Sequence, residues 1–217
     1  MRCKSTLAAA LLVLTAMPCA AEGPAPFAWT GFYVGAGGGA GTVVDVQSES
    51  VSGFGTVFSE TFAQQSYSGV LTAGYDYRIA RQVVVGALFD YEISRFQINN
   101  ASLSIVSLPA ERARTWSIGG RIGFLANPTT LLYILAGYAH SSMDFRDVGD
   151  VDFHGHFVGG GIESRLAGGW FLRGEYRFTQ FGEETVMTCF CADLNAEPSM
   201  HTGRVVLVYR FGQSAPP

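Results

Sequence analysis

The stretch Leu172-Arg173-Gly174-Glu175-Tyr176-Arg177-Phe178 alternates side chains of two kinds. Its even-numbered residues are apolar or glycine, and its odd-numbered residues are all charged. A repeat of two places successive side chains on opposite faces of an extended strand. The stretch therefore predicts a β-strand with one apolar face and one face that carries both arginine and glutamate.

The same alternation recurs along the chain. Each segment that carries it is near the ~10 residues that a tilted strand needs to cross a membrane. The eight segments are Trp29–Gln47, Tyr67–Arg78, Gln82–Ile98, Arg114–Leu125, Leu131–Met143, Phe157–Leu166, Trp170–Phe181 and Gly203–Phe211. The register of Leu131–Met143 stays open, because its first residues are apolar on both faces.

The N-terminus predicts export. Arg2 and Lys4 precede the apolar run Leu7–Ala16, and Cys19-Ala20-Ala21 forms a small-residue cleavage site. We expect a signal peptide at residues 1–21, a periplasmic tail at 22–28, a barrel domain at 29–211 and a C-terminal tail at 212–217.

The exported part contains no apolar run of the ~20 residues that a membrane-spanning helix requires. Such a chain is either soluble outside the cytoplasm or a β-barrel in the outer membrane. Charged residues make up only 15% of the chain and the formal net charge is −4. Nucleic-acid binding is excluded, because it depends on a basic surface.

The connections between the segments alternate in length. Short ones are expected near Ala80-Arg81, Asn127-Pro128 and Ala167-Gly168-Gly169, and long ones at Ser48–Gln64, Asn99–Ala113, Asp144–Gly155 and Glu183–Met200. Outer-membrane barrels have short periplasmic turns and long extracellular loops. The pattern therefore predicts an all-β, eight-stranded, antiparallel up-and-down transmembrane β-barrel.

A soluble barrel of the lipocalin type is the structural alternative. It would turn its charged face to water and its apolar face inward. Here the polar face is mostly Gly, Ser and Thr with few charges, while the apolar face is rich in Tyr, Phe and Trp towards the strand ends. Lipid and its interfaces favour such an apolar exterior, so we interpret the apolar face as lipid-facing.

Four motifs carry a family resemblance. They are Trp29-Thr30-Gly31-Phe32-Tyr33-Val34-Gly35, Val158-Gly159-Gly160-Gly161-Ile162-Glu163, Leu172 to Phe178 as quoted above, and Tyr209-Arg210-Phe211. The chain resembles the opacity-protein-like, RopB-type family of small outer-membrane proteins from about Phe27 to Phe211. The resemblance implies the eight-stranded barrel of the OmpA-type transmembrane domain and a porin-like, structural or host-facing role.

Five charged residues are expected to share the polar face at comparable depth: Arg121, Glu163, Arg173, Glu175 and Arg177. Arginine and carboxylate groups pair well across a lumen of low dielectric constant. An eight-stranded barrel is only wide enough for its own side chains to fill. We therefore interpret the five residues as a structural plug, with a selectivity constriction or gate as the alternative.

Two other sites are weaker. His140 and Ser142 share one face of a strand and resemble the base and nucleophile of lipid A deacylases, which would make the protein a lipid A-modifying enzyme. The connection that holds Asp144, Asp147, Asp150 and Asp152 continues into His154 and His156, which could ligate haem iron. A solvated acidic loop is the preferred interpretation, because the spacing is not that of a calcium loop.

Cys189 and Cys191 are the only cysteines outside the signal peptide. Export to an oxidising compartment favours a disulfide. Because a loop can bend enough to join two such close positions, we expect an intrachain disulfide in the fourth long connection.

The sequence thus predicts a non-enzymatic barrel of the cell outer membrane, with a porin-like or structural role and surface-exposed loops. No cofactor and no metal are expected. The expected partners are outer-membrane lipids and lipopolysaccharide, the barrel-assembly machinery, and host or surface ligands that bind the loops. The alternatives are the lipid A-modifying enzyme and a haem-binding or adhesive surface protein.

Overall fold

The computed structural model describes residues 29–51, 55–97, 110–145, 149–189 and 192–212. Within them, nine strands form one antiparallel sheet. The strands are β1 (Gly31–Val51), β2 (Gly55–Arg78), β3 (Val83–Gln97), β4 (Ala110–Asn127), β5 (Thr130–Phe145), β6 (Gly149–Ala167), β7 (Trp170–Phe181), β8 (Glu184–Cys189) and β9 (Ala192–Arg210). None of these residues belongs to a helix that is long and apolar enough to cross a membrane.

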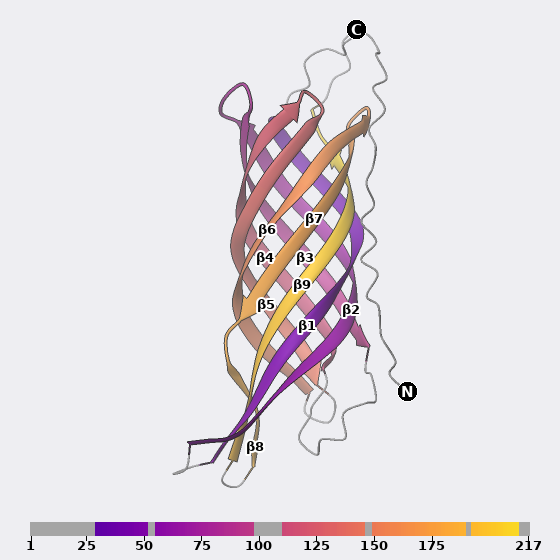
Figure 1. The fold of residues 1–217 in the computed structure, drawn as a ribbon. Helices are drawn as coiled ribbons and strands as arrows, with labels where there is room; N and C mark the ends of the chain where they lie inside the picture. The colour runs from indigo at the N-terminus through magenta and orange to yellow at the C-terminus, as the bar shows by residue number, and fades with distance from the viewer. Residues whose placement is uncertain (1–28, 52–54, 98–109, 146–148, 190–191, 213–217) are drawn as a thin grey trace, which may run out of the picture.

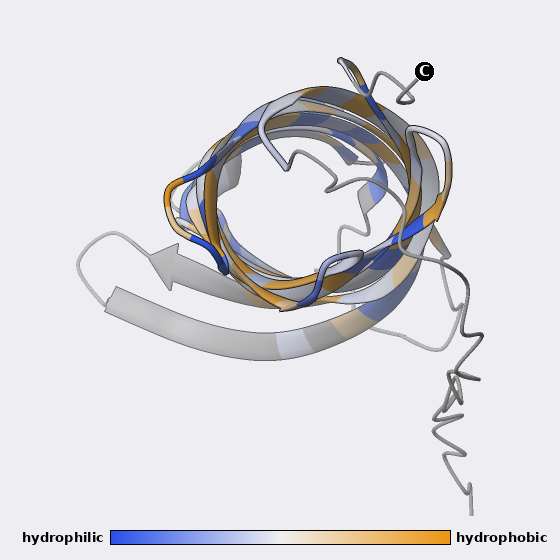
Figure 2. Cartoon of the chain, turned by 90° about the horizontal axis from the view of Figure 1, so that it is seen from above, coloured by the Kyte–Doolittle hydropathy of each residue, from blue (hydrophilic) through white to orange (hydrophobic). Residues whose placement is uncertain are grey.

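Eight of the strands close into a ring. Consecutive strands pair from β1 to β7, β7 pairs with β9, and β9 returns to pair with β1. Figure 2 shows the ring along its axis. β8 lies outside it, paired with the first residues of β9 beyond the point where β7 ends (Figure 1). The prediction of a closed, eight-stranded antiparallel barrel is confirmed.

The outer wall of the ring is apolar. Phe32, Ile134 and Leu71 expose 67%, 66% and 60% of their surfaces to the outside. Contiguous apolar surface of this extent is rare on water-soluble monomers but is what a bilayer requires. The side chains one position away, such as Tyr33 and Thr72, are buried inside the ring. The predicted assignment of faces is therefore confirmed, and the lipocalin alternative is wrong.

The register of β5 is decided by packing. Leu132 and Ile134 point outward, whereas Leu131, Tyr133 and Leu135 are buried inside the barrel. The register could not be predicted from the sequence because both faces of β5 are apolar here. The inward face is apolar because the lumen next to β5 is lined by apolar and aromatic groups.

The three short turns lie where they were expected, between β2 and β3, β4 and β5, and β6 and β7. In the second turn, the backbone N–H of Thr129 donates to Oδ1 of Asn127 at 2.9 Å. In the third turn, Gly168 adopts a φ of 54°, which glycine reaches without the steric cost that a side chain adds. All three turns lie at the end of the barrel opposite to β8 (Figure 1).

The limits of the long connections were predicted wrongly. β1 continues to Val51 and β2 starts at Gly55, so most of Ser48–Gln64 is strand. Likewise, β6 begins at Gly149, β8 lies within Glu183–Met200, and β9 begins at Ala192. An alternation of apolar and polar residues reports a difference between two environments. Beyond the bilayer both faces of a strand meet water, so backbone pairing continues there without an alternating sequence.

The even number of strands and the position of the short turns predict the topology. Both ends of the barrel domain should lie in the periplasm, with the connection between β5 and β6 outside the cell. An epitope tag inserted at Asp147 should therefore bind antibody on intact cells. A tag inserted at Ala80, between β2 and β3, is the control and should be labelled only after permeabilisation. The reverse result would invert the barrel.

Candidate functional site

Charged side chains meet inside the barrel. Five arginines and four carboxylates are almost completely buried there, although the strands that carry them are spread around the ring. The residues are Asp76 of β2, Asp90 of β3, Arg121 of β4, Glu163 of β6, Arg173, Glu175 and Arg177 of β7, and Arg204 and Arg210 of β9. We call this set the lumen charge network.

The part of the network nearer to the short turns centres on Glu163. One of its carboxylate oxygens, Oε2, accepts hydrogen bonds from Arg121 at 3.0 Å and from Arg173 at 2.9 Å. The other oxygen, Oε1, accepts from Nη2 of Arg210 at 2.6 Å. Asp76 pairs with Arg121 and Arg210 at 2.5 and 2.6 Å. Two carboxylates thus hold three guanidinium groups together across the lumen.

The second part of the network lies farther from the turns. Arg177 and Arg204 each donate from Nη2 to Oδ2 of Asp90 at 2.8 Å. The same two arginines bind Oε1 of Glu175, at 3.0 Å for Arg177 and 2.5 Å for Arg204. Two arginines and two carboxylates therefore close a ring of ion pairs that links β3, β7 and β9.

Tyr133 connects the two parts. Its hydroxyl donates to Oε2 of Glu175 at 2.6 Å. Its ring lies 5.0 Å from the guanidinium carbon of Arg121, and Tyr33 stacks on the same guanidinium at 4.8 Å. Cations are attracted to aromatic faces, most strongly away from water. The arginines are thus held by rings as well as by carboxylates.

Glycine makes room for these groups. Gly86 of β3 lies in register between Asp76 of β2 and Arg121 of β4. A Cβ at Gly86 would come within 2.1 Å of Oδ1 of Asp76, a distance that the carboxylate could not tolerate without moving. Glycine on the lumen face therefore allows carboxylates and guanidinium groups on neighbouring strands to meet.

The network fills the lumen with fixed charge. Burying an ion is costly, and pairing repays this cost only when geometry and hydrogen bonding are good. Here each of the four carboxylates forms ion pairs with at least two arginines. Such an arrangement can stiffen the barrel and block or filter the passage of ions.

The structure brings together all five residues predicted for the lumen, Arg121, Glu163, Arg173, Glu175 and Arg177, but in two groups rather than at one depth. The prediction missed four partners, namely Asp76, Asp90, Arg204 and Arg210. Their alternation marks them as lumen-facing. What the sequence lacks is the stagger between strands, which decides which residues of distant segments share a level.

His140 and Ser142, the predicted base and nucleophile, lie on the same face of β5. Both point outward from β5, and no hydrogen bond between them is found in the described part of the chain. The His140 ring instead packs beside Trp116 and His154, with centroids 5.3 and 4.8 Å away. Its Nε2 lies 3.8 Å from Oδ1 of Asp152. The geometry gives no support to a serine nucleophile at this position.

The acidic segment was predicted as a loop, which is wrong for its second half. Outward-facing positions of β6 carry Asp150, Asp152, His154 and His156. Asp147 lies outside the described residues. No cluster of three or more His, Cys, Asp or Glu side chains within the described ranges could hold a metal ion. The imidazole of His154 is engaged by the Tyr138 hydroxyl, 2.5 Å from Nδ1.

Three predictions fall on residues that the structure does not describe. The signal peptide at 1–21 and the tail at 22–28 precede the described range, and most of the tail at 212–217 follows it. Cys191 also lies outside the described residues, next to the end of β8 at Cys189. The disulfide between Cys189 and Cys191 therefore stays a prediction.

Comparison with known protein families decides the identity. The model of the outer membrane protein beta-barrel domain matches residues 6–211, which is most of the chain. The chain belongs to this family. Its members reside in the outer membrane, so the predicted location and the predicted resemblance are confirmed.

Two curated relatives of this family member come from Brucella. The 31 kDa outer-membrane immunogenic proteins of Brucella melitensis biotype 1 and Brucella suis biovar 1 are each 27% identical to it over 208 residues. The alignment covers 85% of this chain and 85% of each relative.

Solved structures of other barrels are also similar. Neisserial surface protein A is 17% identical, with a TM-score of 0.45, and the alignment covers 88% of this chain and 100% of that protein's chain. The outer membrane protein OprG from Pseudomonas aeruginosa is 11% identical, with a TM-score of 0.46, and covers 83% of this chain and 97% of its own.

Proposed function

We propose that this barrel is a structural protein of the outer membrane whose lumen is held closed by paired charges. The single observation that supports this function is the lumen charge network. Its five arginines and four carboxylates come from six of the eight strands of the ring. Ion pairs of this kind hold distant strands together, and their side chains leave little space for a continuous water-filled path through the lumen.

A gated, porin-like conductance is the finer form of the same proposal. Charges that line a narrow lumen also decide which ions pass when the lumen opens. Glu92, 3.6 Å from Arg204 at the edge of the network, adds a fifth carboxylate to those of Asp76, Asp90, Glu163 and Glu175, so the charges of the five arginines are balanced. Removal of one carboxylate should therefore shift rare openings towards anions.

Single-channel recording tests this function. In planar bilayers the wild-type barrel should show only small or rare currents. Glu175→Ala removes the carboxylate shared by Arg177, Arg204 and Tyr133, which loosens the second part of the network and makes the lumen more positive. We expect larger or more frequent openings and a shift towards anion preference.

Two variants serve as controls for this recording. Glu197→Ala removes an exposed glutamate of β9. Among the described residues this glutamate is hydrogen-bonded only to Gln180, so its removal should leave the currents unchanged. Glu175→Gln keeps the volume of the side chain but not its charge, and it should resemble Glu175→Ala in ion preference. A large, steady wild-type conductance that Glu175→Ala does not alter would contradict a closed lumen and support an open porin.

The end of the barrel opposite to the short turns is the part that we propose to be displayed. There β1, β2, β8 and β9 extend beyond the rest of the ring (Figure 1). The Brucella relatives are named as immunogenic proteins, which is in keeping with a surface that antibodies reach. We propose that this extension and its connections present the surface epitopes, or bind the surface ligands, of this chain.

A further inference from the structure

Three arginines lie close together on the outer wall. Arg95 of β3 and Arg112 and Arg114 of β4 all point outward and are exposed. The outer faces of the same two strands carry aromatic and apolar residues beside them: Arg95 comes two residues after Ile93, and Arg114 comes two residues before Trp116. The lumen charge network does not involve them.

Their position along the barrel is that of lipid headgroups. From Phe124, next to the short turn, to Arg114 the outer face of β4 advances ten residues. At ~3.3 Å per residue and a tilt of ~40°, this distance is about 25 Å along the barrel axis, the height of the apolar band of an outer-membrane barrel. Trp116 thus lies at the edge of this band, and the arginines lie just beyond it, at the end opposite to the short turns.

Two of the three arginines lie next to a like charge on the neighbouring strand. Arg95 and Arg112 face each other directly in the ladder between β3 and β4, and Arg114 lies opposite Ile93. Like charges at directly opposed positions destabilise a sheet. On its other side Arg112 lies opposite Asp144 of β5, but within the described part of the chain no carboxylate forms an ion pair with Arg95 or Arg112. An anion bound between the guanidinium groups of Arg95 and Arg112 would remove the repulsion between them.

The space for such an anion is present. A depression of about 390 Å³ is lined by the three arginines together with Ile93, Ser142, Asp144, Gly149 and Asp150. Asp150 is paired with Arg114 at 2.6 Å, and Asp144 is the other carboxylate of the lining. The arginines outnumber the carboxylates, and the hydroxyl of Ser142 adds a neutral hydrogen-bonding group.

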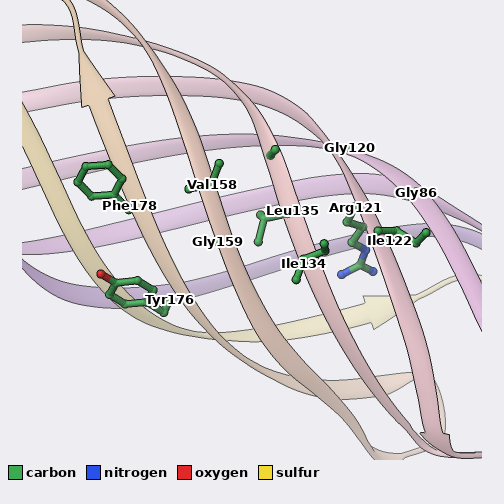
Figure 3. Close-up of a pocket in the computed structure, with 11 residues that line it drawn as sticks. Gly86, Gly120, Arg121, Ile122, Ile134, Leu135, Val158, Gly159, Tyr176 and Phe178 are labelled. Atoms are coloured by element: carbon green, nitrogen blue, oxygen red, sulfur yellow. The ribbon is translucent and has the colours of Figure 1, made fainter.

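A second, apolar depression lies farther down the same wall. It has a volume of about 740 Å³ and is lined in part by Gly120, Ile122, Ile134 and Val158 (Figure 3). Gly120 is exposed on the outer face of β4, six residues from Arg114 towards the short turn. An acyl chain that descends from the arginines would run along this hollow in the barrel wall.

We propose that Arg95, Arg112 and Arg114 form a binding site for the phosphate groups of a phosphorylated, acylated glycolipid in the outer leaflet of the outer membrane. Guanidinium groups bind phosphate oxygens in a bidentate, charge-assisted manner. The arginines hold the headgroup phosphates, and the apolar hollow around Gly120 receives an acyl chain. This site is independent of the lumen and of whether the lumen conducts.

Binding of bisphosphorylated lipid A to the purified mature barrel in maltoside micelles tests the site. The wild type should bind this lipid at least about tenfold more tightly than the same lipid without phosphates, because each guanidinium–phosphate pair is a charged hydrogen bond. The triple variant Arg95→Gln/Arg112→Gln/Arg114→Gln should bind both lipids equally. Arg81→Gln, an exposed arginine at the short-turn end, is the matched control and should behave as the wild type.

The variants also test alternatives. Circular dichroism and heat-dependent migration on gels establish that each barrel is folded; if the triple variant does not fold, the single variants Arg95→Gln and Arg112→Gln should each weaken the preference for phosphate. An unchanged preference in the folded variants would overturn the site. Displacement of lipid A by millimolar inorganic phosphate would also overturn it, because the ligand would then be a free anion rather than a lipid.

Discussion

Replacing Glu163 with alanine is expected to destabilise the folded barrel by about 3–5 kcal/mol, the usual cost of removing one partner from a buried ion pair. Glu163 is completely buried, and its two oxygens bind Arg121, Arg173 and Arg210. Without it, Arg173 loses the carboxylate that pairs with it in the structure, while Arg121 and Arg210 keep only Asp76. Two guanidinium groups then share one carboxylate, and the third has lost its ion-pair partner in a poorly hydrated lumen.

The free energy of unfolding in urea, measured for barrels refolded into vesicles, tests this expectation. Glu92→Ala is the matched control, since Glu92 lies at the edge of the network and its closest arginine, Arg204, is 3.6 Å away. We expect a smaller loss than for Glu163→Ala, because Arg204 keeps Asp90 and Glu175 as closer partners. Equal costs for the two variants would show that the lumen is wet enough to screen its charges.

Replacing Leu207 with arginine should destabilise the inserted barrel by about 2–4 kcal/mol, the cost of a lipid-facing arginine near the bilayer midplane. Leu207 points outward from β9 and lies in register with Ala36 of β1, four residues beyond Phe32. At ~3.3 Å per residue and a tilt of ~40°, Ala36 is about 10 Å from the edge of the apolar band, close to its centre.

Val46→Arg is the control for this second variant. Val46 is also an outward-facing aliphatic residue, but it lies fourteen residues after Phe32 on β1. At the same rise and tilt this is about 35 Å, beyond the apolar band, so the cost should be at most about 1 kcal/mol. A cost for Val46→Arg as large as that for Leu207→Arg would mean that the bilayer covers a different part of the wall.

The faces of the barrel strands could be predicted because lipid and lumen differ sharply. Phe32 and Tyr33 occupy neighbouring positions, yet one faces the outside and the other is buried. The prediction failed where the environments are alike. At Leu131 and Leu132 both faces are apolar, and beyond the bilayer, as at the ends of β1 and β9, both faces are wet.

Only a part of the lumen charge network could be predicted from the alternation. Arg173, Glu175 and Arg177 stand in one strand, so their common face follows from the period of two alone. Asp90 and Arg204 come from segments far apart in the chain, and 2.8 Å separates them only once the ring has closed. The stagger of the strands, which sets their relative depth, is a property of closure and not of any segment.

Sequence alone thus determined the class of fold, the lipid-facing wall and the location in the outer membrane, because each follows from an alternation that can be read locally. Only the tertiary structure decided which charges meet. It joined Glu163 to Arg210 across the lumen, and it placed Arg95 opposite Arg112 on the outer wall. The physical reason is that ion pairs and anion sites depend on distances of a few ångströms between segments, and the closure and register of the sheet set those distances.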